Sequence, residues 1–231
     1  MFLWIIGYPA SFILLNRCMT RRYTYLPGWI LLLSLAAIGS SWVVYRHNYS
    51  TKPTHASFKE APKLPIVKAR IKAGEARQFV RQRGYNNVIC FLVDMSLPSG
   101  QNRFFVFNLK RDTVVNAALV THGRCNQDWL EGRRYGNSIG CGCSSLGKYK
   151  IGHAYNGRFG LAYKLYGLEK TNDNAFKRFV VLHSHECVPE TEVPDEICQS
   201  DGCPTVAPVF LQQLKPIIAR SGKPVLLWIY E

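Results

Sequence analysis

The sequence predicts a mainly β domain with few short helices, preceded by an N-terminal transmembrane helix. Between Arg22 and Arg46 the chain has no charged residue, and residues 26–45 are almost wholly apolar. Further along, β-branched and aromatic runs bounded by Gly, Pro, Asn and Ser dominate the pattern. We therefore divide the chain into a membrane anchor (1–48), a linker (49–74) and one domain (75–231) long enough to enclose its own core.

The apolar segment 26–45 is long enough to cross a bilayer, and Trp29 and Trp42 lie near its two ends, as interfacial aromatic residues do. Three arginines precede the segment: Arg17, Arg21 and Arg22. The positive-inside rule then leaves the N-terminus in the cytoplasm and exports the remainder of the chain. We expect a single-pass membrane protein whose domain lies outside the cytoplasm.

Two alternatives stay open for this segment. A signal peptide cleaved near Ala37-Ile38-Gly39 would release the domain after export. Translation that starts at Met19 instead of Met1 would remove the first apolar stretch and keep the span. The domain lies outside the cytoplasm in each case.

The elements after the span follow from turn signals and periodicity. Residues 49–74, rich in Pro, Lys and Thr, predict a linker, and residues 75–84 predict a short amphipathic helix that stops at Gly84. A second helix is expected over residues 205–218, because Pro208 is tolerated in a first turn. Strands are expected in five further segments: 88–93, 103–109, 113–121, 178–183 and 224–230.

The charge balance is strongly positive, with 29 Lys and Arg against 15 Asp and Glu. Such a chain attracts polyanions, whether nucleic acid, anionic lipid or an acidic polymer such as a cell wall. The chain shows no interleaving of aromatic and basic residues and no recognition-helix pattern. We therefore expect no nucleic-acid partner.

One cysteine stands in a turn that is suited to a nucleophile, Ser200-Asp201-Gly202-Cys203-Pro204. A thiol attacks only as the thiolate, so it needs a base or a positive potential beside it. His183 ends an apolar strand and is separated from Ser200 by sixteen residues, and the helix expected after Cys203 would direct its positive end at the sulfur. From the spacing alone, a purely structural role for Cys203 stays open.

Several segments, in this order along the chain, resemble the murein L,D-transpeptidase family of YkuD-like cysteine enzymes, and in particular its branch with Ser-x-Gly-Cys-Pro. The resemblance covers residues 75–231. Besides the strand ending at His183 and the turn around Cys203, it rests on these segments: 94–99, 119–123, 144–149, 166–169 and 172–175.

The resemblance implies a β-sandwich catalytic domain in the periplasm or outside the cell, held at the bacterial inner membrane. It implies that Cys203 attacks the third residue of a peptidoglycan tetrapeptide stem, expels D-alanine and passes the acyl group to an amine, which gives a 3→3 cross-link. His183 is then the base, the N–H groups of Gly202 and Cys203 are oxyanion donors, and Ser200 shapes the turn. No cofactor or metal is implied, and carbapenems are expected to acylate Cys203.

Two further functions are kept as alternatives. Transfer of the acyl group to water would make the protein an L,D-carboxypeptidase with the same site. A basic domain on a membrane anchor also fits a non-catalytic wall-binding protein. We expect six further residues to line the site: Ser184, His185, His122, Asp201, Pro204 and Tyr149.

The chain departs from the family pattern at two positions. Thr205 stands where most of the family has an arginine, so the carboxylate of a stem peptide must find its cation elsewhere. Asp201 stands where histidine is common, and its carboxylate would oppose thiolate formation unless it points away from Cys203. His183 is preferred over His185 as the base because His183 aligns with the end of the apolar strand.

An exported domain permits disulfides. Cys187 and Cys198 bracket the loop between His183 and Cys203, so a bridge between them would close that loop. Cys125 with either Cys141 or Cys143 is the second candidate pair, and Cys90 lies in an apolar strand. A zinc site is the disfavoured alternative, because the spacing lacks paired knuckles; it would use Cys141, Cys143, Cys187, His183 and His185.

Overall fold

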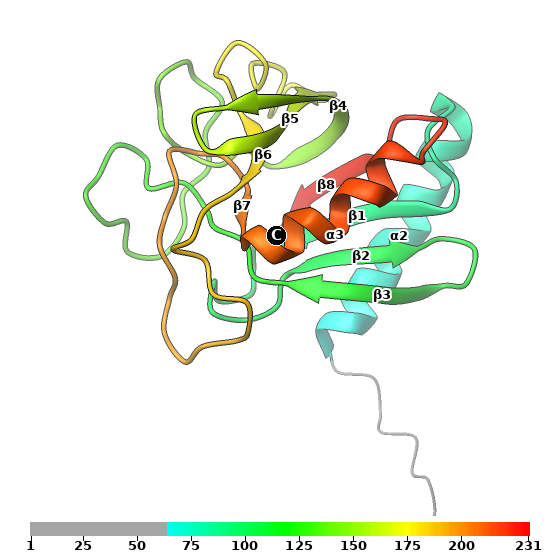
Figure 1. The fold of residues 1–231 in the computed structure, drawn as a ribbon, viewed down its shortest axis with the longest axis horizontal. Coiled ribbons are helices and arrows are strands. Elements are labelled where there is room, and N and C mark those ends of the chain that lie inside the picture. The colour runs from blue at the N-terminus through cyan, green and yellow to red at the C-terminus, as the bar shows by residue number, and fades with distance from the viewer. Residues whose placement is uncertain (1–63) are drawn as a thin grey trace, which may run out of the picture. The chain divides into compact units, whose positions relative to one another are not determined.

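The computed structural model describes residues 64–231, in which eight strands form one continuous sheet (Figure 1). The predicted span at 26–45, its alternatives at Ala37–Gly39 and Met19, and the first part of the predicted linker lie outside the described residues. Within residues 64–231, no helix combines the length and the apolar character needed to cross a membrane.

The strands are arranged in the order β3-β2-β1-β8-β4-β5-β6-β7. Neighbouring strands are antiparallel, apart from the parallel pairs β1–β8 and β6–β7. Their bounds are β1 Ile89–Asp94, β2 Phe104–Asn108, β3 Thr113–Ala118, β4 Gly147–Gly157, β5 Gly160–Gly167, β6 Val181–Ser184, β7 Thr205–Val206 and β8 Leu226–Tyr230.

The prediction of a mainly β domain with few helices is confirmed, but the expected sandwich of two sheets is not what forms. The C-terminal strand β8 pairs with β1 on one side and with β4 on the other, and so joins the two halves into one sheet. Beyond β3, Val120 forms a bridge with Val206 of β7, so the two edges of the curled sheet also meet.

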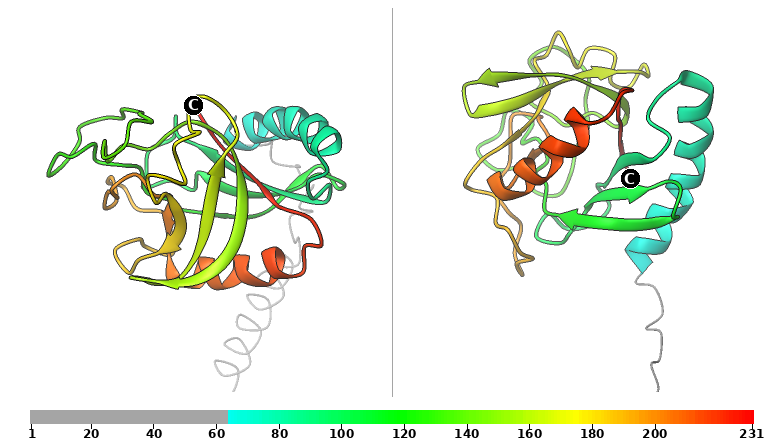
Figure 2. Two further views of the ribbon diagram at one scale, coloured as in Figure 1. Left: turned by 90° about the horizontal axis from the view of Figure 1, so that it is seen from above. Right: turned by 45° about the vertical axis from the view of Figure 1, so that its right-hand side comes forward.

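The two faces of the sheet have different coverings (Figure 2). The inner face packs around the helix α3 (Pro208–Ala219), whose Phe210, Leu211 and Leu214 enter the main core. The outer face packs beneath the helix α2 (Leu64–Arg83) over β1, β2 and β3. Beyond these strands the outer face continues across β4, β5 and β6, where the candidate site lies.

The predicted boundary between linker and domain is wrong, because α2 begins at Leu64 and residues 64–74 are helical. The periodicity misleads here: the small residues Ala69 and Ala73 are buried, whereas Leu64 and Ile71 are exposed. Alanines let the helix approach the sheet closely, so the contact surface of α2 lacks the large apolar side chains that normally identify one.

The second predicted helix begins later than expected, since Thr205 and Val206 form β7 and α3 starts at Pro208. Cys203 therefore lies five residues before the helix, outside the first turn to which the dipole effect is confined. The helix dipole does not account for an activated thiol in this fold.

Candidate active site

Cys203 and His183 line one cavity of about 460 Å³. The pairing of β6 with β7 brings them together, because His183 is the parallel neighbour of Thr205, two residues after Cys203. Of the sixteen residues between His183 and Ser200, Ser184 ends β6 and residues 185–199 form a loop outside the sheet. The cavity is lined by Thr121, Arg124, Asp128, Trp129, Phe159, His183, His185, Cys187, Cys198, Gln199, Ser200, Asp201, Cys203 and Thr205.

The Cys203 thiol is held by the backbone just before β6. Its Sγ lies 3.5 Å from the N–H of Val181, which donates to it, and 3.8 Å from the carbonyl oxygen of Phe179. Burial raises the pKa of Cys203, and the Val181 N–H and the Arg178 guanidinium oppose that rise only in part. At neutral pH the resting group is therefore the thiol.

The His183 imidazole is held in one tautomer. Its Nδ1 lies 3.1 Å from the carbonyl oxygen of Ser184, which can only accept, so Nδ1 carries the proton. Its Nε2 lies 3.0 Å from Oγ1 of Thr205 and accepts that hydroxyl's hydrogen. Burial lowers the pKa of His183 and keeps the ring neutral, which leaves Nε2 able to take a proton.

An exposed aromatic side chain covers this imidazole. The ring of Phe159, in the turn between β4 and β5, stacks on the ring of His183 with 5.0 Å between centroids and meets His185 edge to face. Phe159 thus covers His183 on the solvent side of the cavity. It does so from the turn, since β5 begins only at Gly160.

The nucleophile turn is shaped by Ser200. Its Oγ donates to the carbonyl oxygen of Cys203 at 2.7 Å and accepts the N–H of Gly202 at 3.2 Å. The expectation that Gly202 supplies an oxyanion donor is therefore corrected, because its N–H is already bonded. The N–H of Cys203 has no partner among residues 64–231 and is the available donor.

Glycine is required at position 202 for two reasons. Its φ is +105°, and a Cβ there would lie 2.6 Å from the carbonyl oxygen of Cys143. Arg178 holds that carbonyl in place, since its Nη2 donates to the same oxygen at 2.6 Å and its Nη1 donates to the carbonyl of Gly136. Arg178 is a positioning residue that the sequence pattern did not indicate.

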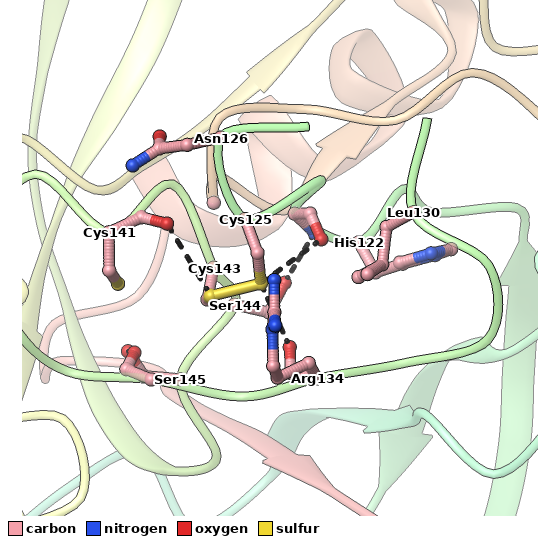
Figure 3. Close-up of a disulfide and its surroundings, with 12 residues drawn as sticks. His122, Cys125, Asn126, Leu130, Arg134, Cys141, Cys143, Ser144 and Ser145 are labelled. Carbon is pink, nitrogen blue, oxygen red and sulfur yellow. Dashed lines mark hydrogen bonds between the residues drawn. A yellow bond between two sulfur atoms is a disulfide. The ribbon is translucent and has the colours of Figure 1, made fainter. Parts of the chain in front are cut away.

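Two disulfides secure the segments on either side of the turn. Cys125 pairs with Cys143, and Cys141 lies close by as a free thiol (Figure 3). The bond ties the segment after β3 to Cys143, whose carbonyl lies against Gly202. Cys187 pairs with Cys198, and both line the cavity. These bonds consume two ligands of the alternative zinc site, and residues 64–231 contain no cluster of three His, Cys, Asp or Glu placed to hold a metal.

The carboxylate of Asp201 turns outward and forms an ion pair with Arg124, with 2.8 Å between Oδ1 and Nε. The backbone N–H of Arg124 donates to the carbonyl oxygen of Ser200, so this residue is tied twice to the nucleophile turn. Arg124 is the only Lys or Arg among the described residues that line the cavity. It is the ion-pair partner of Asp201, whose charge is the smallest of the causes acting on the pKa of Cys203 and raises it.

Of the remaining residues predicted to line the site, some line or adjoin the cavity and two lie elsewhere. His185 lines the cavity, whereas Ser184, Gly202 and Pro204 adjoin its lining residues without lining it. His122 and Tyr149 are both fully buried and do not line it, which corrects their predicted place.

Packing explains both corrections. Tyr149 lies on the inner face of β4, because the odd-numbered residues 147–151, before the register shift in this strand, point into the core, and its hydroxyl donates to the carbonyl of Ser145. The Nδ1 of His122 lies 3.1 Å from the guanidinium of the buried Arg103. The backbone of His122 still supports the site, because its carbonyl accepts the N–H of Ser200.

Sequence reasoning missed Thr121, Arg124, Trp129, Phe159 and the contact between Thr205 and His183. Arg124 follows His122-Gly123 at the end of a predicted strand, which was a usable signal. Phe159 is an aromatic residue inside an Asn-Gly-Arg-Phe-Gly turn, where an exposed apolar ring invites a functional explanation.

Comparison with known proteins gives one match that spans most of the chain: a family model for the L,D-transpeptidase catalytic domain matches residues 64–230. No curated protein matches the sequence. The family model alone carries the assignment, since the structural neighbours described next have low scores.

Three solved structures are similar over 62 % of this chain, each with a TM-score of 0.38. They are an L,D-transpeptidase from Mycobacterium smegmatis (9 % identity), the LD transpeptidase LdtMt1 in complex with imipenem (10 %) and the Ldtfm–avibactam carbamoyl enzyme (11 %). The aligned part covers 59 %, 59 % and 49 % of those chains, respectively.

The buried His122 predicts a specific acid sensitivity. Burial, and then the charge of Arg103, lower the pKa of His122 from 6.5 to about 4. Because the unfolded chain takes up this proton first, the stability is complete above pH 6.5, decreases as the pH falls towards 4 and then levels off, a loss of roughly 3 kcal/mol. Urea unfolding of His122→Gln between pH 7 and 4 should lack this component, whereas the exposed His153→Gln should retain it. A His122→Gln curve parallel to that of the wild type contradicts the assignment.

Proposed function

The chain belongs to the L,D-transpeptidase catalytic domain family, and on that premise we propose that it forms 3→3 cross-links in peptidoglycan through a thioester on Cys203. One observation carries the proposal: the thiol of Cys203 and the unprotonated Nε2 of the neutral His183 share one cavity. The free N–H of Cys203 supports it, because this donor faces no competing acceptor in the described part of the chain.

In the proposed first half-reaction, a bound tetrapeptide stem turns the thiol from the Phe179 carbonyl towards His183. The Thr205 hydroxyl turns its hydrogen from Nε2 to the carbonyl oxygen of Cys203, its other acceptor at 3.4 Å, and Nε2 takes the thiol proton. Sγ attacks the carbonyl carbon of the third residue while the Cys203 N–H stabilises the oxyanion. The proton on Nε2 passes to the departing nitrogen, the C–N bond breaks and D-alanine leaves. Cys203 then carries the acyl group as a thioester.

The second half-reaction reverses these roles. An amine of a neighbouring stem attacks the thioester carbon, His183 removes the proton from that amine, and the C–S bond breaks. The proton on Nε2 returns to the thiolate, which restores the resting pair. The same steps with water in place of the amine describe the carboxypeptidase alternative.

Arg124 is proposed as the cation for a carboxylate of the stem peptide. Thr205 carries no charge and its hydroxyl bonds to His183, so position 205 cannot fill this role. Arg124 lines the cavity; its Nε is engaged by Asp201 and its Nη1 donates to the carbonyl oxygen of Gln127 at 3.3 Å, which leaves Nη2 to a ligand.

We further propose that the domain acts on the outer side of the bacterial inner membrane, with residues 1–48 as its anchor. The two disulfides beside the cavity support this place, because such bonds persist in oxidising compartments.

Cys203 is expected to be the acylated residue. Incubation with a carbapenem should add one adduct to the protein, detected by intact mass, and Cys203→Ala should abolish it, whereas Cys90→Ala and Cys141→Ala should not. With purified muropeptides, Cys203→Ala should lower turnover about a thousandfold or more. Dimers joined 3→3 support the transpeptidase, tripeptides alone indicate the carboxypeptidase, and an unreactive Cys203 favours a non-catalytic wall-binding protein.

Arg124→Gln is expected to lower kcat/KM for the tetrapeptide about ten- to a hundredfold, the loss of a charge-assisted contact. The effect should appear mainly in KM and should vanish with a stem whose carboxylates are amidated. Arg220→Gln, an exposed change at the end of α3, is the matched control. Equal losses with the charged and the amidated stem would remove Arg124 from this role.

The anchor is tested by fractionating cells that produce the full chain. The protein should stay with the membranes after alkaline extraction and should begin at Met1 or Met19. A soluble exported form that begins just after Gly39 would replace the anchor with a cleaved signal peptide.

A further inference from the structure

The outer face of the sheet continues from the catalytic residues onto two lysines. In the ladder between β5 and β6, Ala162 pairs with His183 and Lys164 pairs with Val181; in the next ladder, Lys150 of β4 pairs with Tyr166. Because side chains alternate between faces, His183, Lys164 and Lys150 all lie on the outer face.

Among residues 64–231, no helix lies over this part of the outer face. The helix α2 packs on β1, β2 and β3, and its contact with β4 is through Phe79 on Lys148. Figure 2 shows α2 at the opposite end of the sheet from the β4–β5 hairpin. The face beyond Lys148 is left to its own side chains.

Aromatic rings and ammonium groups alternate across these strands. The ring of Tyr166 stacks on that of Phe176, with centroids 5.0 Å apart and 10° between planes, and 49 % of Phe176 is exposed. Lys150 Nζ lies 4.6 Å from the Tyr166 ring, and Lys164 Nζ lies 4.2 Å from that of Tyr155. We call this set (Lys150, Tyr155, Lys164, Tyr166 and Phe176) the lysine–aromatic surface.

Position 152 is adapted to this arrangement. A Cβ on Gly152 would lie 2.4 Å from Cε2 of Tyr166, so only glycine lets the ring lie down on β4. The ring in turn supports the ammonium of Lys150 from below.

The two lysines carry uncompensated charge. Their neighbour Lys148 forms an ion pair with Glu169 at 2.8 Å. Neither Lys150 nor Lys164 has a carboxylate partner anywhere in residues 64–231. Two fixed cations without counter-charges on an uncovered face are complementary to an anionic ligand.

We propose that the lysine–aromatic surface binds a peptidoglycan strand that extends beyond the reacting stem, with stem carboxylates on Lys150 and Lys164 and a ring of the strand against Phe176. The proposal rests on the proposed function for the choice of polymer. Continuity with the cavity favours that choice over nucleic acid or lipid: Val181, the strand neighbour of Lys164, donates its N–H to the Cys203 sulfur. Lys164 is therefore one strand away from the residue that contacts the Cys203 sulfur, on the face that a polymer extending from the cavity over β5 would meet.

The test measures binding apart from turnover. The full chain with Cys203→Ala is mixed with purified peptidoglycan sacculi and sedimented, and the same protein is compared after Lys150→Glu with Lys164→Glu, and after Lys215→Glu on the exposed side of α3. Reversal of the two charges is expected to weaken sacculus binding about tenfold or more, and Lys215→Glu to leave it unchanged. Phe176→Ala should weaken binding by a smaller factor. Raised salt should weaken sacculus binding by the parent protein and so reduce the difference between the parent and the double variant.

Equal binding by the double variant and the Lys215→Glu control overturns the proposal. It is also overturned if duplex DNA, or micelles containing phosphatidylglycerol, bind the parent protein more tightly than sacculi and lose that binding in the double variant. Lys150→Gln with Lys164→Gln, with unfolding temperatures recorded for every variant, separates loss of the surface from loss of the fold.

The activity of the protein with Cys203 intact distinguishes a failure of the proposed lysine–aromatic surface from a failure of the proposed function. The double variant should process a single disaccharide tetrapeptide as the parent does and show a raised KM only with long strands. Equal kinetics on long strands overturn the surface. If the parent processes neither substrate, the proposed function fails, and the sacculus measurement still decides whether the surface binds the wall polymer.

Discussion

The parallel pairing of Thr205 and Val206 with the end of β6 is the contact on which the site depends. It places Cys203 at the edge of the sheet beside His183, although sixteen residues separate His183 from Ser200. It also brings Oγ1 of Thr205 to Nε2 of His183, so one residue of this short strand orients the proposed base. A strand of two residues has little stability alone, and its surroundings supply what it lacks: Val120 bridges Val206, and the N–H of Thr121 donates to the carbonyl of Thr205.

The two departures from the family pattern, Asp201 and Thr205, each form a contact within the site. Asp201 on the nucleophile turn would disfavour a thiolate, but its carboxylate is paired with Arg124, which enters the cavity from the segment after β3. Thr205 lacks the positive charge of the arginine that most of the family has at this position, but its hydroxyl forms a hydrogen bond with His183. Arg124, the cation that we propose in place of an arginine at position 205, is held beside the turn by the hydrogen bond from its N–H to the carbonyl of Ser200.

The sequence predicted the strands β1, β2, β6 and β8 because they are almost wholly buried, which makes them apolar runs. It predicted β3, which is only half-buried, from its β-branched residues Thr113, Val114 and Val115. It missed β4 and β5, whose outer face is open and carries lysines and glycines in place of apolar residues. Cys203, His183 and Ser200 were found because their chemistry is local in sequence. Arg124, Phe159 and Arg178 were missed because only the fold brings them to the turn, and the lysine–aromatic surface because its alternation runs across strands and not along one.

Burial shifts the pKa values of Cys203 and His183 in opposite directions, and both shifts favour the neutral form of the group. It raises the pKa of Cys203 and lowers that of His183, so the resting pair is a neutral thiol and a neutral imidazole. The thiolate is the form that reacts with oxidants and attacks disulfides, and the proposed compartment is one in which such reactions occur. A site that makes its thiolate only when a stem peptide displaces the Phe179 contact would therefore protect Cys203 between turnovers. In that case the thiolate forms only when the carbonyl that it attacks is already in place.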